Sequence, residues 1–557
     1  MTKNNINIFH TLPAVIRETA KDKGSNTAFT TVGKDEKITY TEAVDHIDSI
    51  IRFLEEHDVH PGDRVAILSV NMPNWALVYF SIASMGAVVV PLLPDFSENE
   101  VFNTLQHSEA KAIFVSKGLD RKIHGHSLPE LKYQFAIEDF SEINNQAKTA
   151  FDIEKKPVND YLVEEQQLAT IIYTSGTTGE SKGVMLSHKN IVFNAIQAGI
   201  VQPINETDRF LSILPLSHTY ENTLGLILPV IYGAQIAYIS KPPTPGVLLP
   251  ALKKVRPTVM LTVPLIIEKI YKSKVRPVIT KNKYTRHLYA IGPLRRAFNR
   301  MIGKKLKKTF GGELKFFGIG GAKLDGVVEQ FLIEAKFPYA IGYGLTETAP
   351  LAAGVNPQTT RWQSTGPAIQ DGEIKINQPD PETGEGEIWI KGPHVMMGYY
   401  KNPKKTHETI TEDGWFKTGD LGKITKDGFL YIKGRLKNMI VGSSGENIYP
   451  EEIESIINNF NHVLESIVVE KKGKLVAMVH FNQQELDDKY HDFKEELVDY
   501  VEQKKQELRD ELLSYVNGRV NRFSRLQLIQ VYSEPFQKTA THKIKRFLYM
   551  ENQSNFN

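Results

Sequence analysis

The sequence predicts an α/β protein with mostly parallel sheets covered by helices, followed by a smaller α+β unit. Three observations carry this prediction. Strand and helix patterns alternate through the first half, which is typical of parallel sheets flanked by helices. A long amphipathic pattern lies among short strand patterns near the end of the chain. With 557 residues the chain is also too long for one core and should divide into several domains.

The first half begins with a helix and then alternates. Residues 40–56 carry an apolar face at helical spacing, and residues 64–70 and 87–94 have the continuous apolar pattern of buried strands. The segment 97-SENE-100 predicts a capping box that opens another helix, and residues 111–117 return to strand. The apolar face of the first helix consists of Ala43, Val44, Ile47, Ile50, Ile51 and Leu54.

The longest apolar run, residues 75–94, is long enough to cross a bilayer. Four residues that disfavour a membrane helix interrupt it: Ser81, Ser84, Gly86 and Pro91. A buried helix followed by a buried strand is therefore the favoured interpretation. The first residues, MTKNNINIFHTLP, lack the apolar core of a signal peptide.

Composition excludes several classes of chemistry. The chain has no cysteine, which rules out disulfides, thiolate metal sites and a cysteine nucleophile, and which suits a cytoplasmic location. A net charge of +2 gives no whole-chain reason to expect a nucleic-acid partner.

The C-terminal part reads as a separate unit. Strand patterns at 466–470, 474–481 and 526–532 surround a long amphipathic helix. The apolar positions of that helix are Phe493, Leu497, Val501, Leu508, Leu512, Val516 and Val520. We expect a boundary near residues 434–438, which divides the chain into a large domain, 1–435, and a small domain, 436–557.

The segment 173-YTSGTTGESKG-183 follows a buried strand pattern at 168–174. Its three glycines let backbone N–H groups approach an anion, and its hydroxyl side chains and Lys182 add donors and charge. A linker would not stand between a buried strand and further ordered structure. The segment is also not a Walker A motif, because serine rather than glycine precedes the lysine. A phosphate-binding loop is the favoured interpretation.

This loop resembles the phosphate loop of the adenylate-forming superfamily, which includes acyl-CoA synthetases, firefly luciferase and the adenylation domains of peptide synthetases. Glu180 and Ser181 stand where the family usually has proline. Further segments resemble family signatures in the family's order: 318-GIGGAKL-324, 342-GYGLTET-348, 414-GWFKTGD-420, 434-GRLKN-438 and 537-QKTATHKIKR-546. The resemblance implies a large domain of mixed and parallel sheets with a barrel-like subdomain, joined to a small mobile α+β domain.

The resemblance also implies roles for individual residues. Tyr343 lies near adenine, Thr346 contacts the α-phosphate, and Asp420 accepts hydrogen bonds from the ribose hydroxyls. Glu347 holds Mg²⁺, a hard cation that prefers oxygen ligands and offsets polyphosphate charge. The implied ATP-binding residues are Thr174, Ser175, Gly176, Thr177, Thr178, Gly179, Lys182, Gly320, Gly321, Ala322, Tyr343, Gly344, Asp420 and Arg435.

By the same resemblance, Lys543 is the catalytic lysine and Lys437 is the hinge. A lysine cation suits the adenylation step, because charge shifts from carboxylate to pyrophosphate there. His542 replaces the glycine that usually precedes the catalytic lysine. We expect Lys545 and Arg546 to form a solvated basic face.

Three stretches favour a long-chain fatty acid as the substrate. The first, 214-LPLSHTYENT-223, resembles a fatty acyl-CoA synthetase signature that places His218 next to the carboxylate. The second, 262-TVPLIIEKIY-271, resembles a long-chain synthetase segment, with Leu265 in place of the usual arginine. The third is the long C-terminal domain. The apolar run 224–239 either lines an acyl tunnel or belongs to the core.

Coenzyme A is the expected acceptor, because 443-SSGENIYPEEIE-454 resembles the segment that meets CoA in synthetases. The implied CoA-binding residues are Ser443, Ser444, Gly445 and Glu446. The predicted reaction is ATP-dependent formation of fatty acyl-AMP, followed by transfer to CoA. Alternatives are a fatty acyl-AMP ligase that loads a carrier protein, a ligase for medium-chain or aryl acids, and a nucleotide-binding scaffold without activity. The presence of Glu347, Asp420, Arg435 and Lys543 argues against the scaffold.

Residues 269–312 contain many lysines and arginines and no aspartate or glutamate. Such a run forms a solvated face or docks on an anionic bilayer, where each basic residue contributes about 1 kcal/mol. The second interpretation would place the protein at the inner face of the membrane as a peripheral protein.

Overall fold

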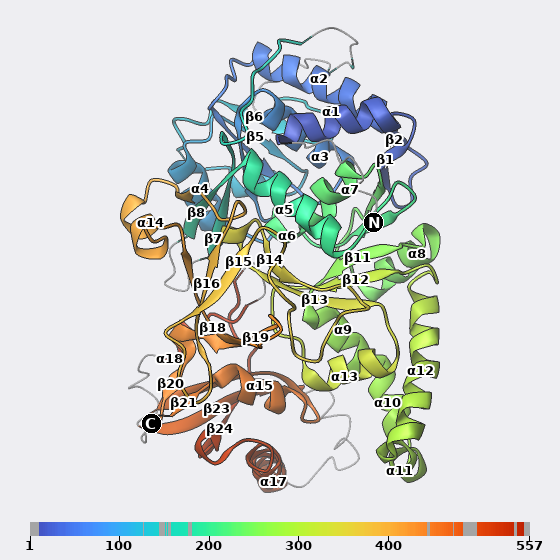
Figure 1. Ribbon diagram of the computed structural model, residues 1–557, viewed down its shortest axis with the longest axis vertical. Coiled ribbons are helices and arrows are strands. Elements are labelled where there is room, and N and C mark those ends of the chain that lie inside the picture. The colour runs from blue at the N-terminus through green and yellow to red at the C-terminus, as the bar shows by residue number, and fades with distance from the viewer. Residues whose placement is uncertain are drawn as a thin grey trace.

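The computed structural model describes residues 10–125, 127–143, 151, 153, 158–175, 181–442, 446–471, 473–482, 498–539 and 543–550. Figure 1 shows the elements stacked along the long axis, with the N-terminal sheet at the top, the strands β11–β13 in the middle and the C-terminal strands at the base. Both expected classes of element, helix-covered parallel sheets and a smaller α+β unit, are present.

The largest sheet has eight strands in the order β14-β13-β12-β11-β9-β10-β1-β2. The six central strands from β13 to β1 run parallel, and an antiparallel strand closes each edge. The strands are β1 (Thr27–Thr31), β2 (Lys37–Thr39), β9 (Arg209–Ser212), β10 (Gln235–Tyr238), β11 (Val259–Thr262), β12 (Phe316–Ile319), β13 (Tyr339–Gly344) and β14 (Leu351–Gly354).

A second sheet has seven strands in the order β17-β8-β7-β4-β3-β5-β6, of which β7 to β6 are parallel. β8 and β17 add an antiparallel edge. The strands are β3 (Arg64–Leu68), β4 (Val88–Leu92), β5 (Ala112–Val115), β6 (Tyr133–Ala136), β7 (Leu168–Ser175), β8 (Ser181–Ser187) and β17 (Gly398–Tyr399). The predicted strands at 64–70, 87–94, 111–117 and 168–174 are confirmed.

Helices fill the space between these two sheets. The predicted helix at 40–56 is α2 (Tyr40–Glu56), and the SENE capping box opens α4 (Glu98–Ser108). The run at 75–94 is α3 (Pro73–Ser84) followed by β4, as predicted. Because α3 contacts β1 in one sheet and β3 and β4 in the other, it is apolar on all sides. No helix in the described part of the chain combines the length and apolar character that a membrane crossing requires.

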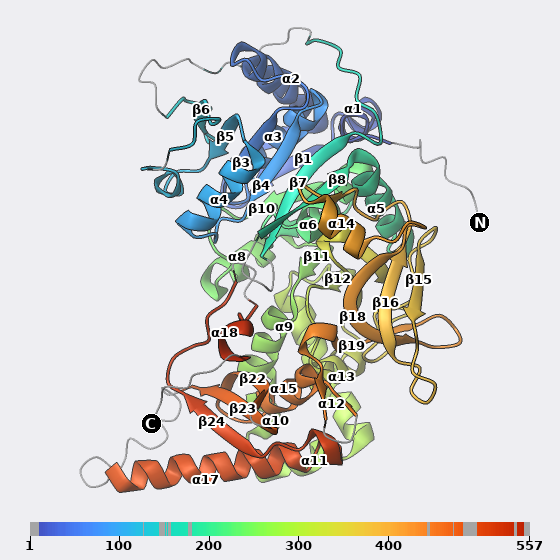
Figure 2. The ribbon, with the colours of Figure 1, turned by 90° about the vertical axis from the view of Figure 1, so that its left-hand side faces the viewer.

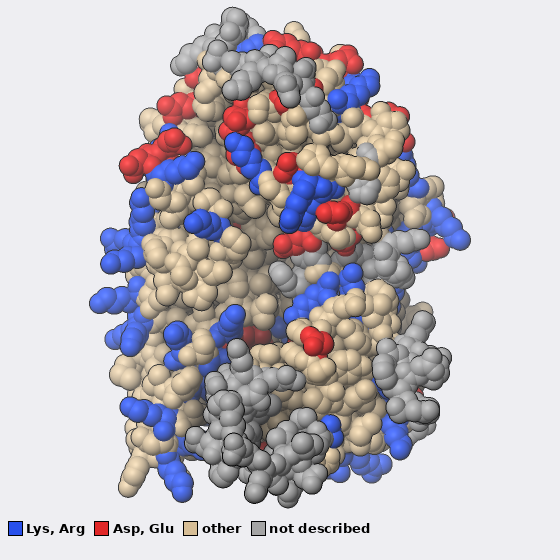
Figure 3. Space-filling model, turned by 180° about the vertical axis from the view of Figure 1, so that it is seen from behind, with Lys and Arg blue, Asp and Glu red and all other residues tan. Residues whose placement is uncertain are grey.

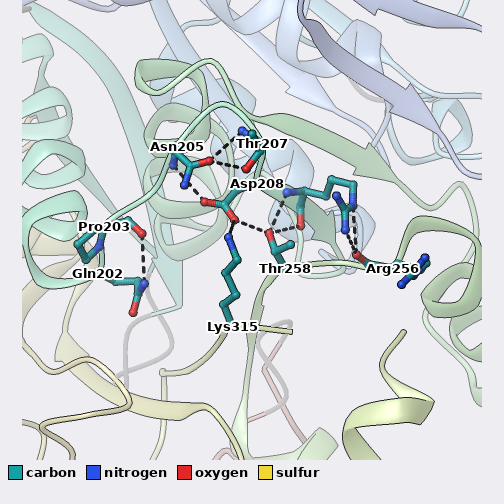
Figure 4. A network of polar contacts seen from close by, with 9 residues as sticks. Gln202, Pro203, Asn205, Thr207, Asp208, Arg256, Thr258 and Lys315 are labelled. Carbon is teal, nitrogen blue, oxygen red and sulfur yellow. Dashed lines mark hydrogen bonds and ion pairs between the residues drawn. The ribbon is translucent and has the colours of Figure 1, made fainter. Parts of the chain in front are cut away.

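A buried carboxylate ties together the amino ends of three strands of the large sheet (Figure 4). Asp208, just before β9, accepts hydrogen bonds from the Thr258 hydroxyl at 2.7 Å and the Lys315 amine at 3.2 Å. Thr258 precedes β11 and Lys315 precedes β12. The other carboxylate oxygen of Asp208 accepts a hydrogen bond from the backbone N–H of Asn205 at 3.0 Å. This network joins the strands at their amino ends. The loops described below leave the opposite, carboxyl ends of the strands.

Short helices and one long helix line the side of the large sheet. α5 (His188–Val201) leads into β9, and a π-helix, η2 (Asn222–Ile227), stands between α6 (Thr219–Glu221) and α7 (Leu228–Ile231). Downstream lie α8 (Pro245–Val255), α9 (Pro264–Ile270), the π-helix η3 (Tyr271–Val275), α10 (Arg276–Thr280), α11 (Lys283–Ala290), α12 (Gly292–Thr309) and α13 (Gly326–Glu334).

An antiparallel sheet of four strands links the large sheets to the C-terminal part. Its order is β15 (Glu373–Asn377), β16 (Gly386–Lys391), β18 (Phe416–Ile424) and β19 (Leu430–Arg435). The 3-10 helix η5 (Leu436–Asn438) follows β19 directly. It lies where the sequence predicts the domain boundary.

The C-terminal lobe has its own apolar core. It contains β20 (Ile440–Val441), β21 (Asn447–Ile448), α15 (Pro450–Asn458), β22 (Val463–Lys471), β23 (Lys474–Phe481), α17 (Val498–Asn517), β24 (Leu528–Tyr532) and α18 (Phe547–Met550). Figure 2 shows α17 along the base, below the β22–β24 sheet. The three predicted strands are confirmed.

Two expectations for this lobe need correction. The long helix ends at Asn517, so Val520 lies beyond it. Leu512 and Val516 are buried as predicted, whereas Phe493, Leu497 and the side chain of Val501 lie outside the described residues.

Arg546 does not belong to a solvated face. Its guanidinium forms an ion pair with Glu454 at 2.7 Å and donates to the Val468 carbonyl at 2.9 Å. The sequence does not reveal this ion pair within the C-terminal basic run, because its partner carboxylate lies 92 residues away in the chain.

Candidate active site

The predicted phosphate loop connects two antiparallel strands, β7 and β8. Thr174 pairs with Lys182 and Ser175 with Ser181 across this hairpin. The loop tip, with Gly176, Thr177, Thr178 and Gly179, lies outside the described residues. Burial and the nearby Lys405 and Lys437 cations lower the pKa of Lys182. Its ammonium lies 5.4 Å from the centre of the Tyr399 ring on β17.

Thr346 and Glu347 lie in a 3-10 turn, η4 (Thr346–Thr348), directly after β13. The Glu347 carboxylate accepts a hydrogen bond from the Tyr399 hydroxyl at 2.9 Å, and its backbone carbonyl accepts from Met396 at 2.9 Å. Gly344 must be glycine here, because a Cβ would lie 1.7 Å from the Pro350 carbonyl oxygen. The turn therefore holds the Glu347 side chain against β17 and close to Lys182.

Asp420 and Arg435 face each other across the β18–β19 pair. The Arg435 Nε lies 2.7 Å from Asp420 Oδ1, and the Tyr343 hydroxyl donates to Oδ2 at 2.7 Å. Burial raises the pKa of Asp420, and the Arg435 cation opposes this rise. One carboxylate thus joins the antiparallel sheet to β13 of the large sheet.

Lys543 comes from the C-terminal lobe and reaches the same place. It keeps an open side toward solvent, yet the protein around its amine desolvates it and lowers its pKa. Arg435 lowers the pKa further, whereas the Asp420 and Glu347 carboxylates raise it. The structure therefore brings Lys543 among three of the residues that the sequence assigns to the nucleotide, although 108 positions separate Arg435 from Lys543.

His218 lies close enough to Lys543 to feel its charge. Burial, with a smaller contribution from the Lys543 cation, lowers the pKa of His218 to about 4. Its Nδ1 accepts a hydrogen bond from the Tyr220 backbone N–H at 3.2 Å. The imidazole is therefore neutral at physiological pH.

Gly320, Gly321 and Ala322 form the turn after β12. Gly321 has a φ of +85°, a conformation that favours glycine, and a Cβ on Gly320 would lie 3.2 Å from the Tyr220 ring. The turn leaves the carboxyl edge of the sheet beside β13. The segments that follow β9, β12 and β13 therefore supply His218, the glycine turn and Glu347 from carboxyl strand ends. The other site residues come from β8, the β18–β19 pair and the C-terminal lobe.

An apolar cavity lies behind this polar region. It is lined by α5, η2, α7 and the strands β11 to β14, with contributions that include Ala198, Val201, Leu224, Leu228, Gly318 and Ile341. From the apolar run 224–239, Leu224, Leu228 and no other residue line it, and the rest of the run is mainly core. The sequence does not mark the cavity-lining residues of α5 and β13, because the patterns of both elements predict only that they are buried.

A buried acidic group adjoins the cavity. Burial raises the pKa of Glu221 to about 8. Its Oε2 has no hydrogen-bond partner among the described residues, and the neighbouring Asn222 and Thr223 side chains are also buried without one. A Cβ on Gly225 would lie 2.7 Å from the Glu221 carboxyl carbon, so the π-helix packs directly on this group. Sequence analysis missed Glu221 and Tyr399, because only the β17–β8 pairing and the π-helix reveal their positions.

The remaining predicted residues lie near the boundary between the lobes. Lys437 is in η5. Ser443, Ser444 and Gly445 lie outside the described residues, and the Glu446 carbonyl accepts from the Gly442 N–H at 2.8 Å.

The two lobes meet through α15. Asp325, at the start of α13, accepts hydrogen bonds with Oδ2 from Ser455 at 3.1 Å and from Asn459. The Lys272 ammonium donates to the Asn458 carbonyl at 2.7 Å. These contacts hold the C-terminal lobe in the arrangement that brings Lys543 to Asp420.

The chain is similar to proteins of a known family. A model of the AMP-binding enzyme family matches residues 16–400. The long-chain-fatty-acid–CoA ligase ACSBG2 of Gallus gallus is 30% identical over 74% of this chain and 59% of its own length. The long-chain-fatty-acid–CoA ligases heimdall of Drosophila melanogaster and FadD15 of Mycobacterium tuberculosis are each 29% identical, over 82% and 78% of this chain. The chain spans 71% and 75% of those two relatives.

Solved structures share the fold. The o-succinylbenzoate CoA synthetase of Bacillus subtilis, in complex with its acyl-adenylate, superposes with a TM-score of 0.76 at 23% identity and covers 97% of this chain and 98% of its own. ATP-bound MatB from Rhodopseudomonas palustris superposes with a TM-score of 0.74 at 23% identity, with the same coverage.

Proposed function

The chain belongs to the AMP-binding enzyme family, and on that premise we propose that it is a long-chain fatty acid–CoA ligase. In the first half-reaction a fatty carboxylate attacks the α-phosphorus of ATP, and the bond to pyrophosphate breaks to leave acyl-AMP. In the second, the CoA thiol attacks the acyl carbon, loses its proton and displaces AMP.

The observation that carries the proposal is the meeting of Lys543 with Asp420, Arg435 and Glu347. These groups, two cations and two carboxylates, come from separate lobes. Such a cluster is suited to a substrate that carries both a ribose and a polyphosphate. A non-catalytic scaffold would not need a desolvated amine close to two carboxylates.

In the adenylation step we assign each group a role that its surroundings allow. Asp420 accepts the ribose hydroxyls, and Lys182 with the β7–β8 hairpin binds the outer phosphates. Lys543 neutralises the charge that builds on the α-phosphate and the leaving pyrophosphate, a contribution of the kind that preorganised cations make in dry sites. His218 stays neutral, and because its Nδ1 accepts from the Tyr220 N–H, its proton sits on Nε2. His218 can therefore donate a hydrogen bond to the carboxylate without repelling Lys543.

The donor set at Glu347 fits a magnesium ion. One of its oxygens accepts the Tyr399 hydroxyl, and the carboxylate is otherwise free to act as one oxygen ligand, with the substrate phosphates supplying others. Mg²⁺ bound there would offset polyphosphate charge during adenylation. Tyr399 keeps the carboxylate turned toward Lys182.

Two observations support a long acyl chain over an aryl acid. The cavity beside Tyr220 is lined mainly by aliphatic and glycine residues, with Phe210, Phe316 and Gln202 among the others, and this mainly aliphatic wall suits an alkyl chain. The relatives named as long-chain-fatty-acid–CoA ligases also match most of this chain. An aryl acid remains the second candidate, because an aryl-CoA synthetase shares the fold.

We infer that the second half-reaction requires the C-terminal lobe to turn about Lys437 and withdraw Lys543. Coenzyme A would then enter beside the segment that contains Glu446. The contacts of α15 with Asp325 and Lys272 must break for this turn.

Pyrophosphate release from ATP with a panel of fatty and aryl acids tests the proposal directly. We expect release to depend on Mg²⁺, to favour long acyl chains, and to be followed by CoA thioester formation. Release without thioester formation would indicate a ligase that loads a carrier protein. Absence of release with every acid would overturn the assignment as an enzyme.

A further inference from the structure

The helices α10, α11 and α12 form a strongly basic edge of the molecule. Residues 269–312, which contain them, carry fourteen lysines and arginines and no aspartate or glutamate. This edge is on the right in Figure 1 and therefore on the left in Figure 3, where Lys and Arg side chains follow one another down the lower part of the outline. The net charge of the whole chain is +2, so the positive charge is concentrated here rather than spread evenly.

Protein carboxylates compensate little of this charge. Arg295 pairs with Glu334 at 2.8 Å, and Lys272 donates to a backbone carbonyl. Within the described part of the chain, the other bases of residues 269–312 form no ion pair. Arg296, Arg300, Lys304, Lys305 and Lys308 are exposed along α12.

Large apolar side chains project from the same helices into solvent. On α11, Tyr284 and Leu288 are 83% and 53% exposed, and Ile291 just beyond its end is 50% exposed. Their spacing of four and three residues places them on one face. The opposite face packs inward, where the Tyr289 hydroxyl donates to Asn299 at 3.0 Å. The exposed stripe is therefore not needed for packing.

α12 repeats the arrangement. Leu294 and Met301 are 44% and 58% exposed and lie seven residues apart, almost in line along the helix. The face directed to the protein carries the buried residues Asn299, Gly303 and Leu306 instead. The exposed apolar residues thus lie on the outer face of α12, among the exposed bases.

We propose that the outer face of α11 and α12 docks on an anionic phospholipid bilayer. Lysine and arginine would meet the headgroup phosphates, while Tyr284, Leu288, Ile291, Leu294 and Met301 enter the boundary with the acyl chains. A helix surface with basic residues around an apolar stripe is the pattern of interfacial membrane binding. The inference does not depend on the proposed enzymatic activity.

Two other occupants fit less well. A nucleic acid would satisfy the bases but would leave the projecting aliphatic side chains in water. A second copy of this chain would bring two faces of the same positive sign together, which is unfavourable at ordinary salt concentrations. Charge complementarity therefore favours a lipid surface.

Vesicle binding by the full chain tests the charge requirement. We expect co-sedimentation with vesicles of phosphatidylcholine and phosphatidylserine, weakened by salt, and little with phosphatidylcholine alone. Combining Arg300→Glu, Lys304→Glu and Lys308→Glu should weaken binding on the order of a hundredfold. The matched control combines Lys34→Glu, Lys37→Glu and Lys426→Glu, three exposed lysines on other surfaces, and should bind as the wild type does. Thermal unfolding of both variants checks that they fold.

A fluorescent label tests the apolar requirement, since the chain has no cysteine of its own. Leu288→Cys carries an environment-sensitive dye on the proposed face, and Leu464→Cys carries it on β22, where the leucine is equally exposed at 53%. We expect phosphatidylserine vesicles to shift the emission of the first dye to shorter wavelength and to leave the second unchanged.

Several results would overturn the proposal. Binding that ignores salt and phosphatidylserine, or that the control variant loses as strongly as the α12 variant, would remove the charge argument. Equal dye responses at positions 288 and 464 would remove the orientation. Binding to duplex DNA that depends on the α12 bases, without vesicle binding, would assign the face to nucleic acid instead.

Discussion

The polar cluster and the apolar cavity share strand β13 but are built in opposite ways. At its end, Tyr343 donates to Asp420, and the following turn holds Glu347. Earlier in the same strand, Ala340, Ile341 and Gly342 line the cavity. The polar cluster depends on hydrogen bonds and an ion pair of 2.7 to 2.9 Å. The cavity instead depends on glycines and other small residues, whose short side chains leave space unfilled.

This difference predicts how each region responds to change. In the polar cluster, removal of one group leaves a charged partner desolvated and without compensation. In the cavity, one added side chain changes the available length and leaves the neighbouring contacts in place. The polar region should therefore control rate, and the cavity should control the choice of acid.

The largest effect is expected for Lys543→Ala. Loss of a preorganised cation at the developing charge should lower the adenylation rate by about a hundredfold to a thousandfold. Thioester formation from supplied acyl-adenylate should be largely retained, because the proposed mechanism withdraws Lys543 before that step. Pyrophosphate release and thioester formation, measured separately, check this.

Lys545→Ala is the matched control, two residues away. It should leave both half-reactions near wild-type rates. Equal loss of both half-reactions in Lys543→Ala would show that the lysine supports the fold rather than the adenylation step.

A change in the cavity wall should alter selectivity by about tenfold to a hundredfold. A Cβ on Gly354 would make ordinary contacts, 3.4 Å from Leu351 and 3.6 Å from Val201, so Gly354→Leu should fold and shorten the cavity. We expect the ratio of kcat/KM for long over short acyl chains to fall, with an unchanged KM for ATP. Gly246→Leu, at a glycine with open space around it, is the control. An unchanged ratio would exclude the cavity as the acyl site.

A smaller effect is expected for Tyr343→Phe. The hydroxyl orients the Asp420 carboxylate, and one such hydrogen bond contributes about 1 kcal/mol, or about fivefold in ATP affinity. ATP titration of the full chain measures this. Tighter binding in the variant would mean that the tyrosine competes with the nucleotide for Asp420.

A last effect concerns Glu221 and appears in stability rather than rate. Its pKa of about 8 exceeds the ordinary value of 4.5, so the folded protein holds a proton that the unfolded chain releases. The associated stability is present below about pH 4.5 and is lost as pH rises through 8. We expect the Tm of Glu221→Gln to fall less than that of the wild type between about pH 5 and about pH 9. Parallel Tm curves for the two proteins would show that Glu221 is ionised in the folded state.

Local patterns in the sequence were sufficient for much of the fold. The helix Tyr40–Glu56, the Ser97 capping box and the parallel strands are encoded by neighbouring residues, so periodicity predicts them. The end of α17 was misjudged because the apolar spacing continues past Gly518. Arg546 was misjudged because its partner is distant in the chain.

The candidate site likewise contains some residues that local motifs predict and others that they do not. Short motifs predicted Asp420, Glu347 and Lys543 as functional residues, and the structure gathers them. The motifs did not reveal Tyr399, which reaches Glu347 only because β17 pairs with β8. They also did not reveal the cavity, because a glycine or valine that borders empty space has the same local pattern as one that is fully packed.

The contact between the lobes at Asp325 has a mechanical consequence. Its Oδ1 accepts the backbone N–H groups of Val327 and Val328 at the start of α13, while Oδ2 accepts from Ser455 and Asn459 of the C-terminal lobe. The two oxygens thus serve two tasks. In the proposed turn of the C-terminal lobe, only Oδ2 loses its partners, so Oδ1 continues to cap α13 and keeps Asp325 in place for the lobe to bind again.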